Sequence, residues 1–402
     1  MDHLYPLKIG SAVVLEPVAC PESDRGYRRA RQRKPCARSG HCAVADETNV
    51  YLFGGYNPDE ETVFQYFGDI REPLFGEVWR YHIPSNQWHL LADECRSHFK
   101  LASMSAVRRG RTVLIYGGTS FPFGHTSSNQ ITWLDVRSIE WHHRSAEGEK
   151  KPINSYGQTI AILDPYLYVF GGTTGWVYCS DVHRCHLHTS KWERVFDLQV
   201  HETKVVKGLT ERNRGVPDPR YRHEMLSDGR RLYVIGGGTS QMAFTLEQLN
   251  VFDTETRQWE LMDTYPDAIH GFPGPRRCHG CAQLDNVGYI TGGYDGERIY
   301  DDIWTLSLDT RKWTKLTAKL PQPVYFHASA ITPSGCLFIH GGVLDKEGRR
   351  RTKSLVRVWV RMQPLLQLAW SCVRSLLKDP STVRKDTLQA MGVPPCLLPD
   401  IG

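Results

Sequence analysis

The chain of 402 residues contains no apolar run that approaches the ~20 residues needed to cross a bilayer, so we expect no membrane span. Its first residues include Asp2, His3 and Pro6 and lack a long apolar core, which argues against a secretory signal. The 11 cysteines are an odd number scattered through predicted strands. We therefore expect reduced thiols and a location in the cytoplasm, or in the cytoplasm and the nucleus.

Recognisable catalytic and cofactor motifs are also missing. The glycine-rich stretch 236–240 has no Lys-Ser/Thr tail and no helix after it, so it is not a phosphate-binding loop. Cys278 and Cys281 have the spacing of a redox or zinc motif, but no second pair accompanies them in the predicted strand. No Ser–His–Asp set, paired carboxylates or Tyr/Cys/His metal site can be assembled. The sequence thus predicts a non-catalytic protein with no metal and no cofactor.

Positive charge is concentrated in one short stretch. Six of the ten residues 25–34 are basic, and subtracting them from the net charge of +5 leaves 5 − 6 = −1 for the remainder. A nearly neutral body argues against broad binding of nucleic acid through the folded surface. The basic stretch itself is compatible with a nuclear-import signal, an RNA-binding arm or a solvated leader.

What the sequence does contain is a glycine pair that ends a short apolar run six times, at spacings of 63, 54, 65, 56 and 49 residues. A repeat of roughly 50 residues built from strands and turns is typical of a propeller or solenoid. The pairs are Gly54–Gly55, Gly117–Gly118, Gly171–Gly172, Gly236–Gly237, Gly292–Gly293 and Gly341–Gly342.

A second marker follows five of the pairs: a tryptophan stands seven residues after an apolar or aromatic residue, with turn formers between them. This spacing predicts a hairpin with a large cross-strand pair. With one strand before each glycine pair, every unit offers four short antiparallel strands. The pairs are Tyr81 and Trp88, Leu134 and Trp141, Cys185 and Trp192, Phe252 and Trp259, and Leu306 and Trp313.

These units resemble kelch repeats over about residues 36–360, which implies an all-β, six-bladed propeller. The sixth unit lacks its tryptophan, because position 365 is leucine. Its outer strand is therefore missing, and the candidate strand 12–15 is the natural donor, since closure removes exposed sheet edges. We expect a leader with this closing strand at 1–35, the propeller at 36–360 and a short helical tail at 361–402.

The tail begins at Pro364, where apolar residues recur at helical spacing. Leu365, Ala369 and Val373 resemble the box through which ubiquitin-ligase receptors bind Elongin C; the alternative is an amphipathic helix packed on the propeller. Pro380 and Val383 resemble the box that selects Cullin 2, although Asp379 stands where that family usually has an apolar residue. A further hypothesis is that the terminal Gly402 occupies the receptor's own binding site.

Several stretches, including 38–41, 53–58, 171–175, 220–224 and 323–327, resemble the kelch domain-containing protein 10 family. The resemblance implies a substrate receptor that works with Elongin B/C, Cullin 2 and its RING subunit, and that binds proteins ending in glycine. The alternative is a kelch scaffold or actin-binding protein without a ligase role.

A terminal carboxylate needs a guanidinium, further hydrogen-bond donors and, for glycine, close aromatic walls. Residues after each glycine pair and before each first strand are expected to gather on one face of the ring. The alternative for each is that it braces a strand turn. The predicted substrate-binding residues are Arg38, Tyr56, Tyr156, Trp176, Arg222, Ser240, Arg277, Tyr294, Tyr325 and His327.

Overall fold

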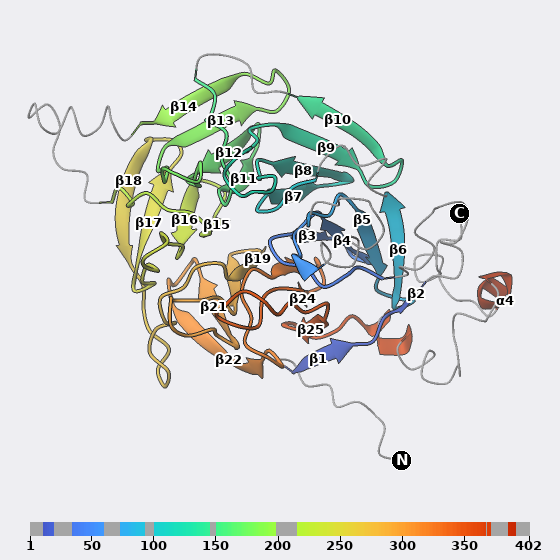
Figure 1. Ribbon diagram of the computed structural model, residues 1–402. Helices are drawn as coiled ribbons and strands as arrows, with labels where there is room; N and C mark the ends of the chain where they lie inside the picture. Colours follow the sequence, from blue (N-terminus) through green and yellow to red (C-terminus); the bar gives the residue numbers. More distant parts are fainter. Residues whose placement is uncertain are drawn as a thin grey trace, which may run out of the picture.

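The computed structural model is a ring of six β-sheets around a central axis (Figure 1). It describes residues 11–19, 34–59, 73–92, 100–144, 150–197, 215–366, 368–370 and 385–390. Five sheets have four strands, and the sheet of the first blade has a fifth. The prediction of an all-β, six-bladed propeller with a short helical tail is confirmed.

Each blade runs from the axis to the rim in sequence order. The first three blades contain β3 (Cys42–Ala45), β4 (Asn49–Phe53), β5 (Val78–His82) and β6 (Gln87–Ala92); β7 (Ser105–Arg109), β8 (Thr112–Tyr116), β9 (Ile131–Asp135) and β10 (Glu140–Arg144); and β11 (Thr159–Leu163), β12 (Tyr166–Phe170), β13 (Val182–His186) and β14 (Trp192–Phe196). The last three contain β15 (Glu224–Ser227), β16 (Arg231–Ile235), β17 (Gln248–Asp253) and β18 (Gln258–Asp263); β19 (Gly280–Leu284), β20 (Val287–Thr291), β21 (Asp302–Ser307) and β22 (Trp313–Lys319); and β23 (Ala328–Ile331), β24 (Cys336–His340) and β25 (Leu355–Trp359).

The amino-terminal segment closes the ring from both sides. Strand β1 (Ala12–Leu15) pairs antiparallel with β25 and supplies the fourth strand of the sixth blade, as the missing tryptophan predicts. Strand β2 (Val18–Ala19) then pairs parallel with β6, the outer strand of the first blade. One short segment therefore joins the last blade to the first.

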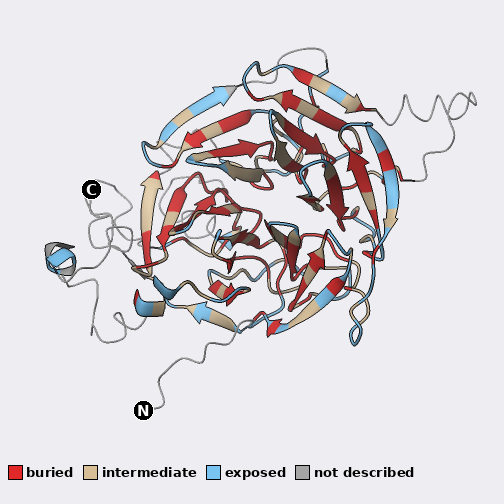
Figure 2. Ribbon diagram, turned by 180° about the vertical axis from the view of Figure 1, so that it is seen from behind, coloured by how far each residue is buried: buried red, intermediate tan, exposed pale blue. Residues whose placement is uncertain are grey.

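The predicted hairpins have the expected register. Tyr81 lies opposite Trp88, and the other four pairs are aligned in the same way. Large apolar side chains fill the space between neighbouring blades; at the closing seam, for example, Trp88 of the first blade packs in one cluster with Phe338 and Trp359 of the sixth. Figure 2 shows that burial is greatest on the middle strands of the blades and falls toward the rim; the second strand of each blade is almost wholly buried, whereas innermost strands such as β7 are only partly so.

Each glycine pair makes room for a side chain wedged between two blades. Gly171 has φ +68°, and a Cβ there would lie 2.5 Å from Cε1 of His223 in the next blade. Its neighbour Gly172 has φ +95°, and a Cβ there would lie 2.9 Å from Cβ of Gln158 in its own blade. Only glycine fits both the left-handed backbone and the close approach. The wedge residues of the six blades are His41, Met104, Gln158, His223, His279 and His327.

The tail contributes helical residues 365–366 and 368–370, together with α4 (Lys385–Ala390). No helix within the described ranges is long and apolar enough to cross a membrane.

Candidate functional site

A closed circle of six backbone hydrogen bonds surrounds the axis where the innermost strands begin. One residue of each blade donates its N–H to the carbonyl oxygen of the corresponding residue in the preceding blade, at 2.7–3.0 Å. The circle closes where Gly40 of the first blade donates to Phe326 of the sixth. All six residues have φ between +54° and +66°. The circle fixes the register of the blades and consists of Gly40, Ser103, Gly157, Arg222, Cys278 and Phe326.

Arg222 reaches from this circle across the axis. Its Nη2 donates to Oγ of Ser103 in the second blade and lies 3.1 Å from the point that a Cβ on Gly40 would occupy. Its guanidinium also stacks 4.6 Å from the ring centre of Phe326 in the sixth blade. Burial lowers the pKa of Arg222, and its Nε is buried without a hydrogen-bond partner. In the described part of the chain no carboxylate forms an ion pair with it.

A second circle, formed by isolated antiparallel bridges, lies beside the first. In each blade the residue before the first circle pairs with the residue after the glycine pair, for example Tyr156 with Thr173 and Arg277 with Tyr294. Five of the predicted residues are members of these bridges, so the fold brings them together around the axis. They are Tyr56, Tyr156, Arg277, Tyr294 and Tyr325.

Arg277 is a second guanidinium available on this face. It is 9% exposed, and its Nη1 has no hydrogen-bond partner. Its guanidinium lies 5.8 Å from the ring centre of Tyr294, which in turn stacks on Tyr325 with ring centres 5.1 Å apart. Among the described residues it has no ion pair. Two cationic groups with unused donors therefore stand among aromatic rings.

Sequence reasoning missed a third arginine, Arg351. Its guanidinium lies 4.9 Å from the ring centre of Tyr56, and its Nε donates to Oγ of Ser39 at 3.0 Å. Burial lowers its pKa. A charged turn at 345–353 is visible in the sequence, but only the closure of the ring brings Arg351 beside Ser39 and Tyr56 of the first blade.

Trp176 and Ser240 lie on the loops above the circles. The Trp176 side chain is 90% exposed, and its loop stands on Thr173, the bridge partner of Tyr156. The backbone N–H of Ser240 donates to Oη of Tyr178 at 2.8 Å, which ties the loops of the third and fourth blades together. Both residues belong to the rim of the face.

Arg38 lies inside the ring wall and His327 lies between two blades beside the axial cavity, so neither is on the face, and we remove both from the predicted site. Arg38 is fully buried: its Nη2 pairs with Glu77 at 2.8 Å, and its Nη1 donates to the Gly54 carbonyl at 3.0 Å. Arg220 and Arg276 make the same hydrogen bond to the carbonyl oxygens of Gly236 and Gly292, so this arginine is a structural element repeated in three blades. His327 is a wedge whose Nε2 accepts from Gly280 N at 3.1 Å.

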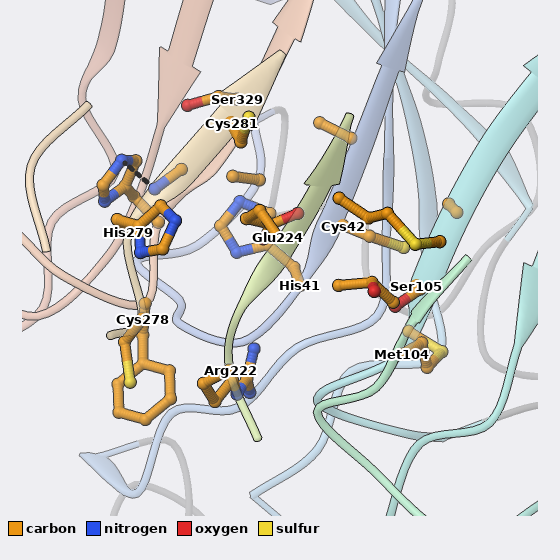
Figure 3. A pocket seen from close by; sticks show the side chains of 18 of the residues that line it. His41, Cys42, Met104, Ser105, Arg222, Glu224, Cys278, His279, Cys281 and Ser329 are labelled. Atoms are coloured by element: carbon orange, nitrogen blue, oxygen red, sulfur yellow. Dashed lines mark hydrogen bonds between the residues drawn. The ribbon is translucent and has the colours of Figure 1, made fainter. Parts of the chain in front are cut away.

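Below Arg222 a cavity of about 120 Å³ continues along the axis, and all six blades line it. Figure 3 shows Arg222 at one end of the lining side chains, Cys281 and Ser329 at the other, and Glu224 between them. Burial raises the pKa of Glu224 to about 8, so its carboxyl group is mostly neutral at pH 7. No local pattern in the sequence indicates that this residue faces the axis. Among the described residues, no group of three or more metal-ligating side chains could hold a metal ion.

The tail presents two of its predicted contact residues to solvent. Leu365 is 83% exposed and Ala369 is exposed, one helical turn apart on the same side. Trp370 is only 6% exposed, and its Nε1 donates to the carbonyl oxygen of Pro84 at 2.8 Å. Val373, Pro380, Val383 and Gly402 lie outside the described residues.

Comparison with known proteins adds a family to this geometry. The KLHDC2/KLHL20/DRC7 Kelch-repeats domain matches residues 27–205 and 195–375. The chain is 44% identical over 346 residues to Kelch domain-containing protein 10 of Xenopus laevis, covering 86% of this chain and 80% of that one. It is 42% identical over 363 residues to the Homo sapiens protein of that name, covering 90% and 78%. The Drosophila melanogaster homolog is 32% identical over 385 residues, covering 90% and 61%.

Proposed function

Because the chain belongs to the kelch domain-containing protein 10 family, we propose that it is the substrate-recognition subunit of a Cullin 2 ubiquitin ligase. The propeller face binds the carboxyl terminus of a protein that ends in glycine, and the tail binds Elongin C. The chain breaks no bond itself. It acts by proximity, because holding the substrate at the ligase raises its effective concentration there.

The observation that carries the proposal is the position of Arg222. Its guanidinium stands on the axis with a buried Nε that lacks a partner, and no described carboxylate neutralises it. An unpaired buried donor on a cation is costly, so an incoming carboxylate recovers a charge-assisted hydrogen bond. We call the space enclosed by the two circles, with Arg222 at its base and Tyr156, Tyr294 and Tyr325 around it, the cup. The main chain at a protein's carboxyl terminus is narrow enough to reach the base of this cup.

The walls favour a terminal residue without a side chain. Tyr156, Tyr294 and Tyr325 surround the axis at the level of the second circle, and Arg277 lies among them. Aromatic walls at this level leave little room for a Cβ beside the carboxylate. The same rings pack well on the flat main chain of glycine.

The face is tested with a peptide that ends in glycine. We expect binding to the full chain when the peptide has a free carboxylate and loss of binding when it is amidated, because amidation removes the charge. Arg222→Met should weaken binding by about tenfold or more, the effect of losing hydrogen bonds to a charged group. Arg349→Met is the matched control, because Arg349 is exposed on a loop of the sixth blade. Equal binding of the acid and the amide contradicts the proposal.

The tail is tested separately by capture of purified Elongin B/C. Leu365→Asp should abolish capture, because a charge cannot enter an apolar pocket without a large desolvation cost. Met362→Asp is the control, since Met362 is 75% exposed and precedes the helix. Unchanged capture by Leu365→Asp, or cosedimentation with actin filaments that is independent of the tail, favours the scaffold alternative.

A further inference from the structure

Among the described residues of the tail helix, Trp370 is the side chain that is buried against the propeller. Trp370 is 6% exposed although Leu365, Leu366 and Ala369 around it are at least partly open to solvent. Its indole Nε1 donates to the Pro84 carbonyl, and Leu368 N donates to Pro364 O at 3.1 Å within the same turn of helix. In Figure 1 this turn lies at the outer edge of the ring, close to β1 and β2.

The acceptor belongs to the β5–β6 turn, which is held from several sides. Oη of Tyr81 donates to Oδ1 of Asn86 at 2.8 Å, and His82 Nδ1 lies 2.7 Å from Oγ of Ser85. Asn86 Nδ2 also donates to the carbonyl oxygen of Glu16, between β1 and β2, at 2.9 Å. The turn 84–86 therefore contacts both the closing segment and the tail, and it is a fixed point of the first blade.

Docking of Trp370 decides which side of the helix is free. Leu365 and Ala369 are one turn apart, whereas Trp370 is displaced by about 100° from Ala369 around the helix axis. With the indole buried against the turn 84–86, the side that carries Leu365 faces away from the ring. A helix free to rotate would present either side.

We infer that the turn 84–86 is an intramolecular docking site for the tail and that Trp370 is a positioning residue, which fixes the Leu365 and Ala369 side relative to the cup. This inference rests on the proposed function for its consequence. A substrate held in the cup is then presented at one orientation to the ligase, and transfer of ubiquitin depends on that orientation while neither binding step does.

The first test uses the full chain alone. In Trp370→Ala we expect the amide hydrogens of residues 368–370 to exchange faster with solvent than in the unchanged chain. Trp370→Phe keeps an apolar ring but removes the N–H donor, so docking should weaken by about tenfold, the effect of one lost hydrogen bond. Met362→Ala, which precedes the helix and is 75% exposed, is the control and should exchange as the unchanged chain does. Equal exchange in all variants overturns the docking site.

The second test uses the reconstituted ligase with Elongin B/C, Cullin 2 and a substrate ending in glycine. We expect Trp370→Ala to bind the substrate peptide and Elongin C as the unchanged chain does, but to transfer ubiquitin at least about tenfold more slowly because the effective concentration of the target lysines falls. Equal transfer overturns the positioning role. If the unchanged chain binds neither Elongin C nor the peptide, the proposed function fails, while the exchange result still decides whether the tail docks.

Discussion

His340 of the sixth blade and His41 of the first are hydrogen-bonded to each other, Nδ1 to Nε2 at 3.0 Å, across the seam where the ring closes. Both imidazoles are buried, and burial holds the pKa of His340 at about 3 and that of His41 well below its usual range. The shared hydrogen bond needs a neutral acceptor, so the seam cannot accommodate two imidazolium ions. Wedge histidines at three other blade interfaces are also buried and neutral: burial lowers the pKa of His223 to about 3, that of His327 to about 4 and that of His279 well below its usual range.

These five histidines predict that the propeller loses stability in mild acid. Their folded pKa values lie below the unfolded value of 6.5, so the unfolded chain binds more protons, and the stabilisation present above pH 6.5 is lost as pH falls toward 3. At pH 5 each of these histidines should lower the free energy of unfolding by about 2 kcal/mol relative to its value above pH 6.5. Denaturant unfolding measured from pH 7.5 to 4.5 checks this, and a midpoint that does not move over the range contradicts it.

The wedge arrangement predicts unequal effects of two glycine substitutions. Gly171 and Gly110 both have left-handed backbones, with φ +68° and +61°, but a Cβ on Gly110 meets nothing within 4 Å. Gly110→Ala should therefore lower the free energy of unfolding by only about 1–2 kcal/mol, the cost of a left-handed backbone for alanine. Gly171→Ala should lose about 1–3 kcal/mol more, because its Cβ collides with His223. Thermal and chemical unfolding of the two variants measures the difference, and equal losses exclude the wedge as the cause.

The buried ion pair of Arg38 and Glu77 in the first blade predicts that removing Glu77 strongly lowers the stability of the fold and leaves peptide binding unchanged. Glu77→Ala leaves the Arg38 guanidinium buried without its counter-charge and removes the acceptor for Trp79 Nε1, which donates at 2.8 Å. We expect a loss of about 3–5 kcal/mol. Glu255→Ala, which breaks the exposed pair with Arg230, should cost about 0–1 kcal/mol. The affinity of folded Glu77→Ala for the peptide should be unchanged. Weaker binding would show that Arg38 does belong to the binding site.

Glu224 predicts that peptide affinity falls in mild alkali. Its carboxyl group is neutral below its pKa of about 8 and ionised above it, where it faces the same cavity as Arg222 and repels a bound carboxylate. The imidazoles of His41, His279 and His327, which also line the cavity, are neutral throughout this range because burial lowers their pKa values.

From pH 7 to 9 the affinity for a peptide with a free carboxylate should fall by about tenfold, the effect of one like charge at an effective dielectric constant of about 20. Glu224→Gln should remove the dependence, and an amidated peptide should not show it. Isothermal titration at several pH values provides the measurement. A decline of the same size in Glu224→Gln assigns the effect to another group.

The sequence predicted the blades well because their signals are local. A glycine pair after an apolar run, and a tryptophan seven residues after a large side chain, each depend on the geometry of one hairpin, and the observed registers agree. The destinations of the arginines could not be predicted in this way. Arg38 and Arg222 both precede an innermost strand, but they stand two positions apart within the repeat. Arg38 therefore bonds the Gly54 carbonyl inside the wall, whereas Arg222 extends across the axis to Ser103.

Long-range contacts account for what was missed. Arg351 reaches Tyr56 only because the ring closes, and Glu224 faces the cavity because of its place on β15. Trp370 lies beside the predicted helical stripe in the sequence, but nothing local shows that its partner is the carbonyl oxygen of Pro84, 286 residues earlier.

The clasp formed by β1 and β2 imposes an order on biosynthesis. Strand β1 leaves the ribosome first, yet its partner β25, at Leu355–Trp359, is made after five complete blades. Until β25 is made, β1 has no partner strand, although β2 can already pair with β6 of the first blade. Until β1 pairs with β25, the newly made sixth blade keeps an open edge that another chain could pair with. The last event in folding therefore belongs to the earliest strand, and the interval before it is when this protein is most exposed to misassembly.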